Sequence, residues 1–145
     1  MIKIVNHAID EAAILASVKS DNAGACILFS GTTRRLTGDK VTDTLSYQAY
    51  EAMAEKELSK LRDCAMQRWS LVACAIVHRI GEVPVGQTSV VVAVSSPHRV
   101  GAFESAAWIM DTLKKDVPIW KKEVYADGRQ EWVHPENQIE SAEGQ

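Results

Sequence analysis

The sequence predicts an α+β fold, because strand-like segments are mixed along the chain with two long helical segments. A length of 145 residues fits a single domain spanning residues 1–145. The content of 46% hydrophobic and 24% charged residues is that of a globular protein with a sizeable core. We therefore expect one folded unit that ends in a frayed tail at about residues 135–145.

The first half of the chain is predicted to contain a short helix, two strands and a loop. Residues 10–19 carry apolar side chains at near-helical spacing, with Asp10 at the N-cap. The apolar run 24–30 predicts a buried strand, and the polar, glycine-bounded segment 31–40 predicts a loop. Residues 42–50 alternate polar and apolar side chains, which is typical of a strand with one exposed face.

The second half is predicted to contain both long helices and the remaining strands. Residues 52–69 form the first amphipathic helix, and a second helix covers about 98–116. Between them, the strands 71–80 and 88–94 can pair as a hairpin. Residues 119–133 are expected to form a closing hairpin around an Asp-Gly turn.

Charge and hydropathy exclude several classes of partner. Sixteen Lys and Arg against nineteen Asp and Glu give a net charge of −3, so no overall positive field attracts nucleic acid or an anionic membrane. The longest apolar runs are strand-sized, far short of a membrane span. The N-terminus lacks the pattern of a secretory signal, which makes a cytoplasmic location the expectation.

The cysteines do not predict a disulfide framework, a zinc site or a nucleophile. Cys26, Cys64 and Cys74 are odd in number, have no CxxC spacing and have no adjacent base. We expect them to pack as small reduced hydrophobic residues. The chain also lacks the GxSxG, HExxH, P-loop and GxGxxG motifs.

A helix N-terminus offers the first candidate site. Ser96 is a predicted N-cap and Pro97 a predicted first helical residue, followed by His98 and Arg99. Unpaired N–H groups and the helix dipole favour anions there, and the two cationic side chains add to this. The pattern indicates a phosphate site, although His98 and Arg99 could equally be first-turn surface residues.

Two lysines offer the second candidate site. On the second long helix, Lys114 continues an apolar stripe that contains Phe103, Ala107 and Met110. Its ammonium either snorkels to water or occupies a partly desolvated cleft, where a lowered pKa would make it a usable acid, base or nucleophile. Alternation along residues 119–123 then places Lys121 and Glu123 on one face of a strand and Lys122 on the other.

Short motifs spread over most of the chain add a resemblance to a known family. They are 29–34 (FSGTTR), 45–50 (LSYQAY), 78–81 (HRIG), 95–99 (SSPHR), 111–114 (DTLK) and 118–123 (PIWKKE). With them the sequence resembles, from about residue 24 to 133, the MoaE family of large catalytic subunits of molybdopterin synthase. The resemblance implies an α/β hammerhead fold with an added antiparallel β subdomain.

The resemblance also implies an activity and an assembly. Family members are sulfurtransferases of molybdenum cofactor biosynthesis that convert cyclic pyranopterin monophosphate, precursor Z, to molybdopterin by installing two dithiolene sulfurs. The sulfur arrives as a thiocarboxylate on the C-terminal Gly-Gly tail of a small ubiquitin-like subunit of the MoaD family. A homodimer of large subunits carries one small subunit at each end, forming a heterotetramer. The resemblance implies neither a metal nor a cofactor.

The functional residues of the family match nine positions of this chain. They are Thr32, Thr33, Arg34, His98, Arg99, Lys114, Lys121, Lys122 and Glu123. Charge-assisted hydrogen bonds from Arg34, His98 and Arg99 are expected to hold the phosphate and the pterin. Lys114 is expected to meet the thiocarboxylate and stabilise an oxyanion, and Lys121 to bind substrate and serve acid–base steps.

Departures from the family pattern and one alternative function accompany this resemblance. Thr33, Arg35 and Gln48 differ from the residues usual in the family, which affects the specificity of the loop more than the reaction. The alternative is a non-enzymatic docking module whose lysines only anchor the carboxylate of a ubiquitin-like tail. A homodimer is expected in either case, because predicted strands have edges that need cover. Such a dimer allows the loop and the helix end of one site to come from different subunits.

Overall fold

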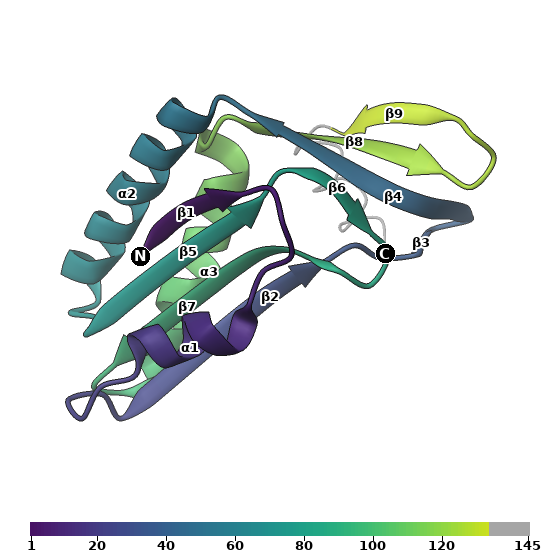
Figure 1. Ribbon diagram of the computed structural model, residues 1–145. Helices are drawn as coiled ribbons and strands as arrows, with labels where there is room; N and C mark the ends of the chain where they lie inside the picture. Colours follow the sequence, from purple (N-terminus) through teal and green to yellow (C-terminus); the bar gives the residue numbers. More distant parts are fainter. Residues whose placement is uncertain (134–145) are drawn as a thin grey trace.

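The structure, a computed structural model, shows an α+β fold with two sheets and describes residues 1–133 (Figure 1). The predicted tail at 135–145 lies outside the described residues. The helices are α1 (Glu11–Val18), α2 (Glu51–Arg68) and α3 (Arg99–Asp116). The strands are β1 (Ile2–Val5), β2 (Ala25–Thr32), β3 (Leu36–Thr37), β4 (Lys40–Ala49), β5 (Ala73–Arg79), β6 (Gly81–Pro84), β7 (Thr88–Ser96), β8 (Ile119–Tyr125) and β9 (Gln130–Val133).

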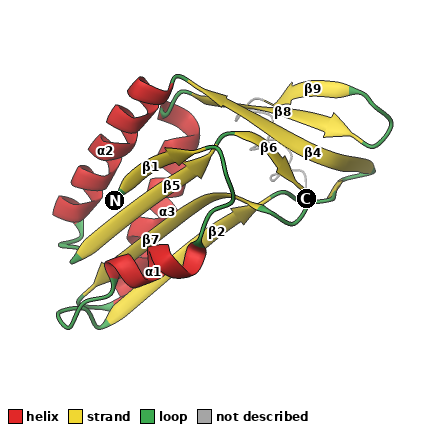
Figure 2. Ribbon diagram, in the orientation of Figure 1, coloured by secondary structure: helices red, strands yellow, loops and turns green. Residues whose placement is uncertain are grey.

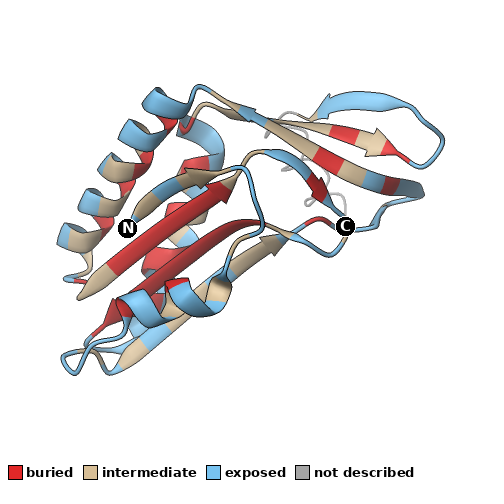
Figure 3. Ribbon diagram, in the orientation of Figure 1, coloured by how far each residue is buried: buried red, intermediate tan, exposed pale blue. Residues whose placement is uncertain are grey.

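The first sheet has the strand order β1-β5-β7-β2 and is covered by helices on both faces (Figure 2). Strand β1 runs parallel to β5, and the other neighbours are antiparallel. Helices α2 and α3 pack on one face against Val90, Val92 and Val94, whereas α1 packs on the other against Val91 and Ala93. The two central strands are therefore buried on both sides, as the colours of Figure 3 show.

The second sheet is antiparallel and extends away from the helices, beside the first sheet (Figure 1). Its main order is β3-β4-β8-β9, and β6 also pairs with β4. Residues Thr44–Tyr47 of β4 are aligned with β6 on one edge and with β8 on the other. The predicted hairpin at 119–133 is confirmed as β8 and β9, and Gly128 in its turn has φ +88°.

Two predictions for the first half of the chain were wrong. The apolar run 24–30 lies in β2, which is the edge strand of its sheet, and Phe29 is 40% exposed. The segment 31–40 is mostly paired: β2 continues through Thr32, and β3 forms a hairpin with β4. Its polar residues suit these edge positions, where one side of the strand faces solvent. Gly38, at φ +63°, makes the tight turn.

The predicted pairing of 71–80 with 88–94 is confirmed as β5 with β7, but their connection is more than a turn. It contains β6, which leaves the first sheet and joins the second. Gly81 adopts φ +83° where the chain turns out of β5, a conformation that glycine adopts without steric cost. The connection therefore links the two sheets.

The start of α3 also differs from the prediction. The N-cap is His98, with no side-chain capping hydrogen bond, and the helix begins at Arg99. Ser96 is instead the last residue of β7 and is buried, and Pro97 lies between strand and helix. By contrast, α1 begins as predicted, because the Asp10 side chain accepts a hydrogen bond from the Ala13 N–H at 3.1 Å.

We expect Leu58→Ala to lower the free energy of unfolding by about 2 to 5 kcal/mol, because it leaves a cavity in the core. Leu58 lies on α2 with no exposed surface and packs in the cluster between the helices and the sheet. Urea denaturation measures the change. The matched control is Lys56→Ala, an exposed position on the same helix, which should stay within about 0.5 kcal/mol of the parent protein. Equal losses for both variants would contradict this packing.

Candidate active site

A cavity of about 360 Å³ lies where the C-terminal end of α3 meets the second sheet. Three lysines line it, Lys114 and Lys115 from α3 and Lys121 from β8. Neutral polar side chains, among them Tyr47, His78 and Ser89, line it as well. These side chains come from α3, β4, β5, β7 and β8, so both sheets must form before the cavity exists.

Lys121 is the more deeply placed lysine. Antiparallel pairing of β4 with β8 puts Tyr47 directly opposite it, so that both side chains share one face of the sheet. The pKa of the Lys121 amine is lowered to about 8, chiefly by burial and then by the positive charges of Lys114 and Arg34. The Glu123 carboxylate acts in the opposite direction. Lys121 is therefore an amine that can give up or take a proton near neutral pH.

Glu123 is a buried carboxylate held by two hydroxyl groups. The Thr42 hydroxyl donates to one carboxylate oxygen, and the Tyr125 hydroxyl donates to the other at 3.3 Å. The Tyr125 hydroxyl also donates to Glu131 at 2.9 Å, and burial with these carboxylates raises the Tyr125 pKa. Glu123 thus supplies a fixed negative charge on the same face of β8 as Lys121.

Lys114 lies at the cavity, but not for the reason that the sequence indicated. The buried face of α3 consists of Ala102, Ser105, Ala106, Ile109 and Leu113. The predicted stripe lies on a different face, where Phe103 is 64% exposed and Met110 is half-buried. Lys114 is exposed in the last turn of α3, and Lys115 beside it also lines the cavity. The helical spacing therefore identified an apolar face that does not pack in the core.

The predicted substrate loop divides into residues with different roles. Thr32 ends β2 and lines the cavity. Thr33 is buried, and its hydroxyl donates to the Val83 carbonyl at 2.9 Å, which fastens the loop to β6. Arg34 is exposed, and its charge reaches Lys121. In this chain Thr33 acts as an anchor for the loop, whereas Thr32 lines the cavity and Arg34 lies exposed two residues further on.

His98 and Arg99 are not at this cavity. They lie at the N-terminal end of α3, whereas Lys114 lies in its last turn. At a rise of 1.5 Å per residue, Arg99 is about 22 Å from Lys114 along the helix axis. A single chain therefore cannot bring together the predicted anion group of Arg34, His98 and Arg99.

Lys122 faces away from Lys121, as the alternation predicted. Its ammonium lies 5.8 Å from the centre of the Trp132 ring, and Lys122 and Trp132 are aligned across β8 and β9. Trp132 is itself partly exposed on the same surface. A ligand contact from Lys122 would therefore be made from the opposite face of the strand.

Sequence reasoning missed Tyr47, His78 and Ser89 as site residues. Each lies within a strand whose apolar pattern was recognised, but the register between strands cannot be read from periodicity. One signal was present: His78 continues the row of Cys74 and Ile76 along β5, where apolar side chains face the core. A histidine buried in such an apolar row costs free energy unless its ring is hydrogen-bonded, so it indicates a structural or functional role.

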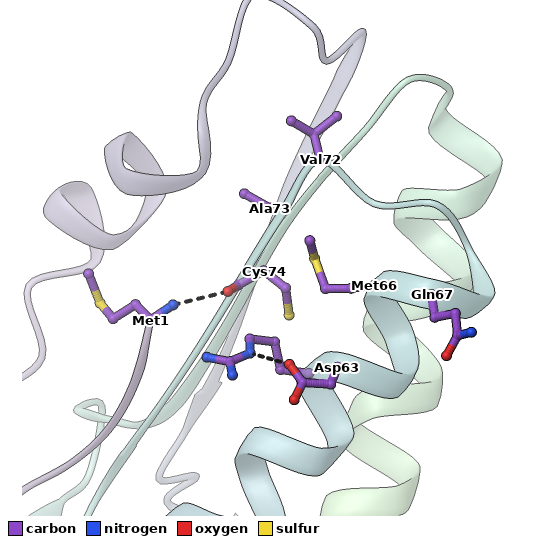
Figure 4. Close-up of a pocket in the computed structure, with 8 residues that line it drawn as sticks. Met1, Asp63, Met66, Gln67, Val72, Ala73 and Cys74 are labelled. Atoms are coloured by element: carbon purple, nitrogen blue, oxygen red, sulfur yellow. Dashed lines mark hydrogen bonds and ion pairs between the residues drawn. The ribbon is translucent and has the colours of Figure 1, made fainter.

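A second cavity, of about 610 Å³, lies between α2 and the start of β5 (Figure 4). The N-terminal amine donates a hydrogen bond to the Cys74 carbonyl at 3.2 Å beside it. Burial raises the pKa of the Cys74 thiol to about 11, which keeps it protonated and unreactive. Cys26 and Cys64 are exposed, so the expectation that all three cysteines pack as hydrophobic residues was wrong.

Residues 1–133 contain no group of three or more His, Cys, Asp or Glu side chains placed to hold a metal ion. No helix within this part of the chain is long and apolar enough to cross a membrane.

The fold and the cavity define an α+β protein of two sheets with a lysine-lined cavity where they meet α3. The profile of the family described as "MoaE protein" matches residues 4–116. The chain belongs to the MoaE family, whose members are enzymes of molybdenum cofactor biosynthesis.

Individual relatives agree with this assignment. The molybdopterin synthase catalytic subunit of Culex quinquefasciatus is 45% identical over 134 residues, covering 90% of this chain and 85% of that protein. The crystal structure of molybdopterin synthase from Staphylococcus aureus matches with a TM-score of 0.84 at 36% identity, covering 90% of this chain and 94% of that one. A structure described as a complex of subunits 1 and 2 of molybdopterin-converting factor from Helicobacter pylori 26695 shares the fold. Its TM-score is 0.75 at 24% identity, covering 91% and 89% of the two chains.

The charges around Lys121 can be tested one at a time. We expect Lys114→Ala to raise the pKa of Lys121 above about 8, because a neighbouring positive charge is removed, and Glu123→Gln to lower it, because a negative charge is removed. Titration of protein labelled with carbon-13 at the lysine ε position, followed by NMR, measures both. Lys19→Ala, at the end of α1 on the other face of the first sheet, is the control and should leave the Lys121 pKa in place. A shift of the same sign in Lys114→Ala and Glu123→Gln would contradict the assigned environment.

Proposed function

We propose that this chain converts cyclic pyranopterin monophosphate to molybdopterin, with sulfur delivered as a thiocarboxylate on the Gly-Gly tail of a small ubiquitin-like subunit. The observation that carries the proposal is one cavity that contains an exposed lysine, Lys114, and a half-buried lysine of lowered pKa, Lys121. Membership of the MoaE family supports the reaction class. The Helicobacter pylori structure, described as a complex of two subunits of one converting factor, supports the small partner.

The two lysines suit different parts of this reaction. Lys114 is exposed at the end of α3, where a carboxylate or thiocarboxylate tail can approach it from solvent. An ammonium there would stabilise the oxyanion that forms when water adds to the tail carbonyl; the oxyanion then collapses as the carbon–sulfur bond breaks, which leaves the sulfur on the pterin and a carboxylate on the tail. Lys121 is half-buried and titrates near neutral pH, so it suits the proton transfers that accompany sulfur transfer. This division of roles follows from the difference in burial.

The anion of the substrate would be bound by groups from two chains. Arg34 and Thr32 lie at the cavity side of one chain, whereas His98 and Arg99 lie at the far end of α3. A homodimer that brings the α3 N-terminus of one subunit to the cavity of the other would complete the site. The exposed apolar side chains Phe29 and Phe103, on β2 and α3, offer surface that such a dimer can cover.

Lys114→Ala should lower single-turnover conversion of precursor by about 100-fold or more, the usual scale for a preorganised charged group. Binding of the partner should fall much less. Lys114→Arg keeps the charge but presents a planar fork in place of a compact head, so it should not restore full activity. The assay mixes each variant with excess thiocarboxylated partner and follows consumption of the pterin.

Lys19→Ala is the activity control, because Lys19 lies at the end of α1 and does not line the cavity, whereas Lys115 does. A near-normal rate for Lys114→Ala, or an equal loss for Lys19→Ala, would contradict the role of Lys114. If the parent protein binds the partner and leaves the pterin unchanged, the chain is a docking module and the proposed reaction is wrong.

Complementation tests the shared site. We expect Arg99→Ala and Lys121→Ala homodimers each to lose most activity. A mixed dimer contains one site with neither substitution and one site with both, so co-expression of the two chains should restore activity to up to about half of the parent level per dimer. Sedimentation of the parent protein should show a dimer at micromolar concentration. An inactive mixed dimer would show that each site comes from one chain.

A further inference from the structure

His78 is a polar side chain in a core position. On β5 it follows Cys74 and Ile76 on the face that packs toward α2 and α3, and it is 4% exposed. An aliphatic side chain would fill this position without the cost of burying a polar ring. The position is also where β5 reaches the cavity, which His78 lines.

Hydrogen bonding fixes the state of the ring. His78 Nδ1 lies 2.8 Å from the Arg79 carbonyl oxygen, and a carbonyl only accepts, so Nδ1 carries the hydrogen. The pKa of the His78 ring is lowered to about 4, chiefly by burial, with a smaller contribution from the positive charge of Lys121. The ring is therefore neutral at physiological pH, with Nε2 unprotonated.

Tyr47 connects this ring to Lys121. Its ring meets the His78 ring edge to face, with centroids 5.0 Å apart and an interplanar angle of 68°. Tyr47 is also aligned with Lys121 across β4 and β8, on the same face. Two uncharged rings thus lie between the core of the first sheet and the Lys121 amine.

We propose that His78 is a positioning residue for Lys121: with Tyr47 it forms an uncharged wall that keeps water away from the amine and directs it into the cavity. The charged groups around Lys121 are Lys114 and Lys115 from α3, Arg34 from the segment after β2 and Glu123 from β8 itself. The charges of Lys114 and Arg34 favour the neutral amine, and that of Glu123 opposes them. From β5 and β4, His78 and Tyr47 contribute burial without charge.

The inference rests on the proposed function for its catalytic meaning, but its first test uses the free protein. We expect His78→Ala to raise the Lys121 pKa from about 8 by about one pH unit or more, because water enters beside the amine. His78→Gln keeps a neutral polar side chain of similar reach and should leave the Lys121 pKa within about half a unit of the parent value. Both are measured by NMR titration of carbon-13-labelled lysine.

Ile76→Ala is the matched control, because it removes a fully buried side chain two residues earlier on the same face of β5. It should destabilise the protein without moving the Lys121 pKa. Tyr47→Phe keeps the ring of the wall and should also leave the Lys121 pKa in place. An unchanged pKa in folded His78→Ala, or an equal rise in Ile76→Ala, would overturn the inference. If His78→Ala does not fold, a shifted Lys121 pKa in Tyr47→Phe would overturn it and an unshifted one would support it.

The pH dependence of turnover separates this inference from the proposed function. If Lys121 serves acid–base steps, the pH–rate profile of His78→Ala should move in the same direction as the Lys121 pKa. If the Lys121 pKa shifts in His78→Ala but the pH–rate profile of this variant does not, the result supports the role of His78 and contradicts the acid–base role of Lys121.

Discussion

The site depends on one constraint: strand β4 is hydrogen-bonded along both edges. Strand β6 occupies one edge and β8 the other, over the same residues of β4. Because β6 follows β5 after a single turn, its pairing holds the end of the first sheet, with His78, against the strand pair that carries Tyr47 and Lys121. If β6 slipped by one residue, every side chain of this short strand would exchange faces, and the buried side chain of Val83 would leave the core.

Burial outweighs direct charge in setting the chemistry of Lys121. Removal of the amine from water is the largest cause of its lowered pKa, and nearby positive charges come second. The negative charge of Glu123 acts against both effects and raises the Lys121 pKa. The Glu123 carboxylate itself accepts hydrogen bonds from the hydroxyls of Thr42 and Tyr125. The site thus combines an unusually acidic ammonium with a buried carboxylate that is held by hydroxyl groups, which leaves the Lys121 amine available to a ligand.

Local patterns predicted the helices and most of the strands, because periodicity and capping residues are properties of adjacent residues. These patterns gave wrong or incomplete predictions where the structure depends on contacts between segments that are distant in the sequence. Helix α3 has apolar side chains on two faces, and only the sheet determines that Ile109 rather than Phe103 is buried. The pairing of Tyr47 with Lys121 and the anchoring of Thr33 to Val83 likewise depend on strand register and loop closure. Lys114 and Lys121 were predicted as site residues from residue spacing and from the family resemblance, whereas the uncharged wall of His78 and Tyr47 could be found only from the fold.

Helix α3 is a single unbroken element with functional groups at both ends. If the proposed dimer forms, the C-terminal end of each helix lies at one site and its N-terminal end at the other. Each helix would then be a rigid element that joins the two sites of the dimer. A ligand that displaces Arg99 at one site would also displace Lys114 at the other, so ligand binding at one site would be coupled to the reaction at the other.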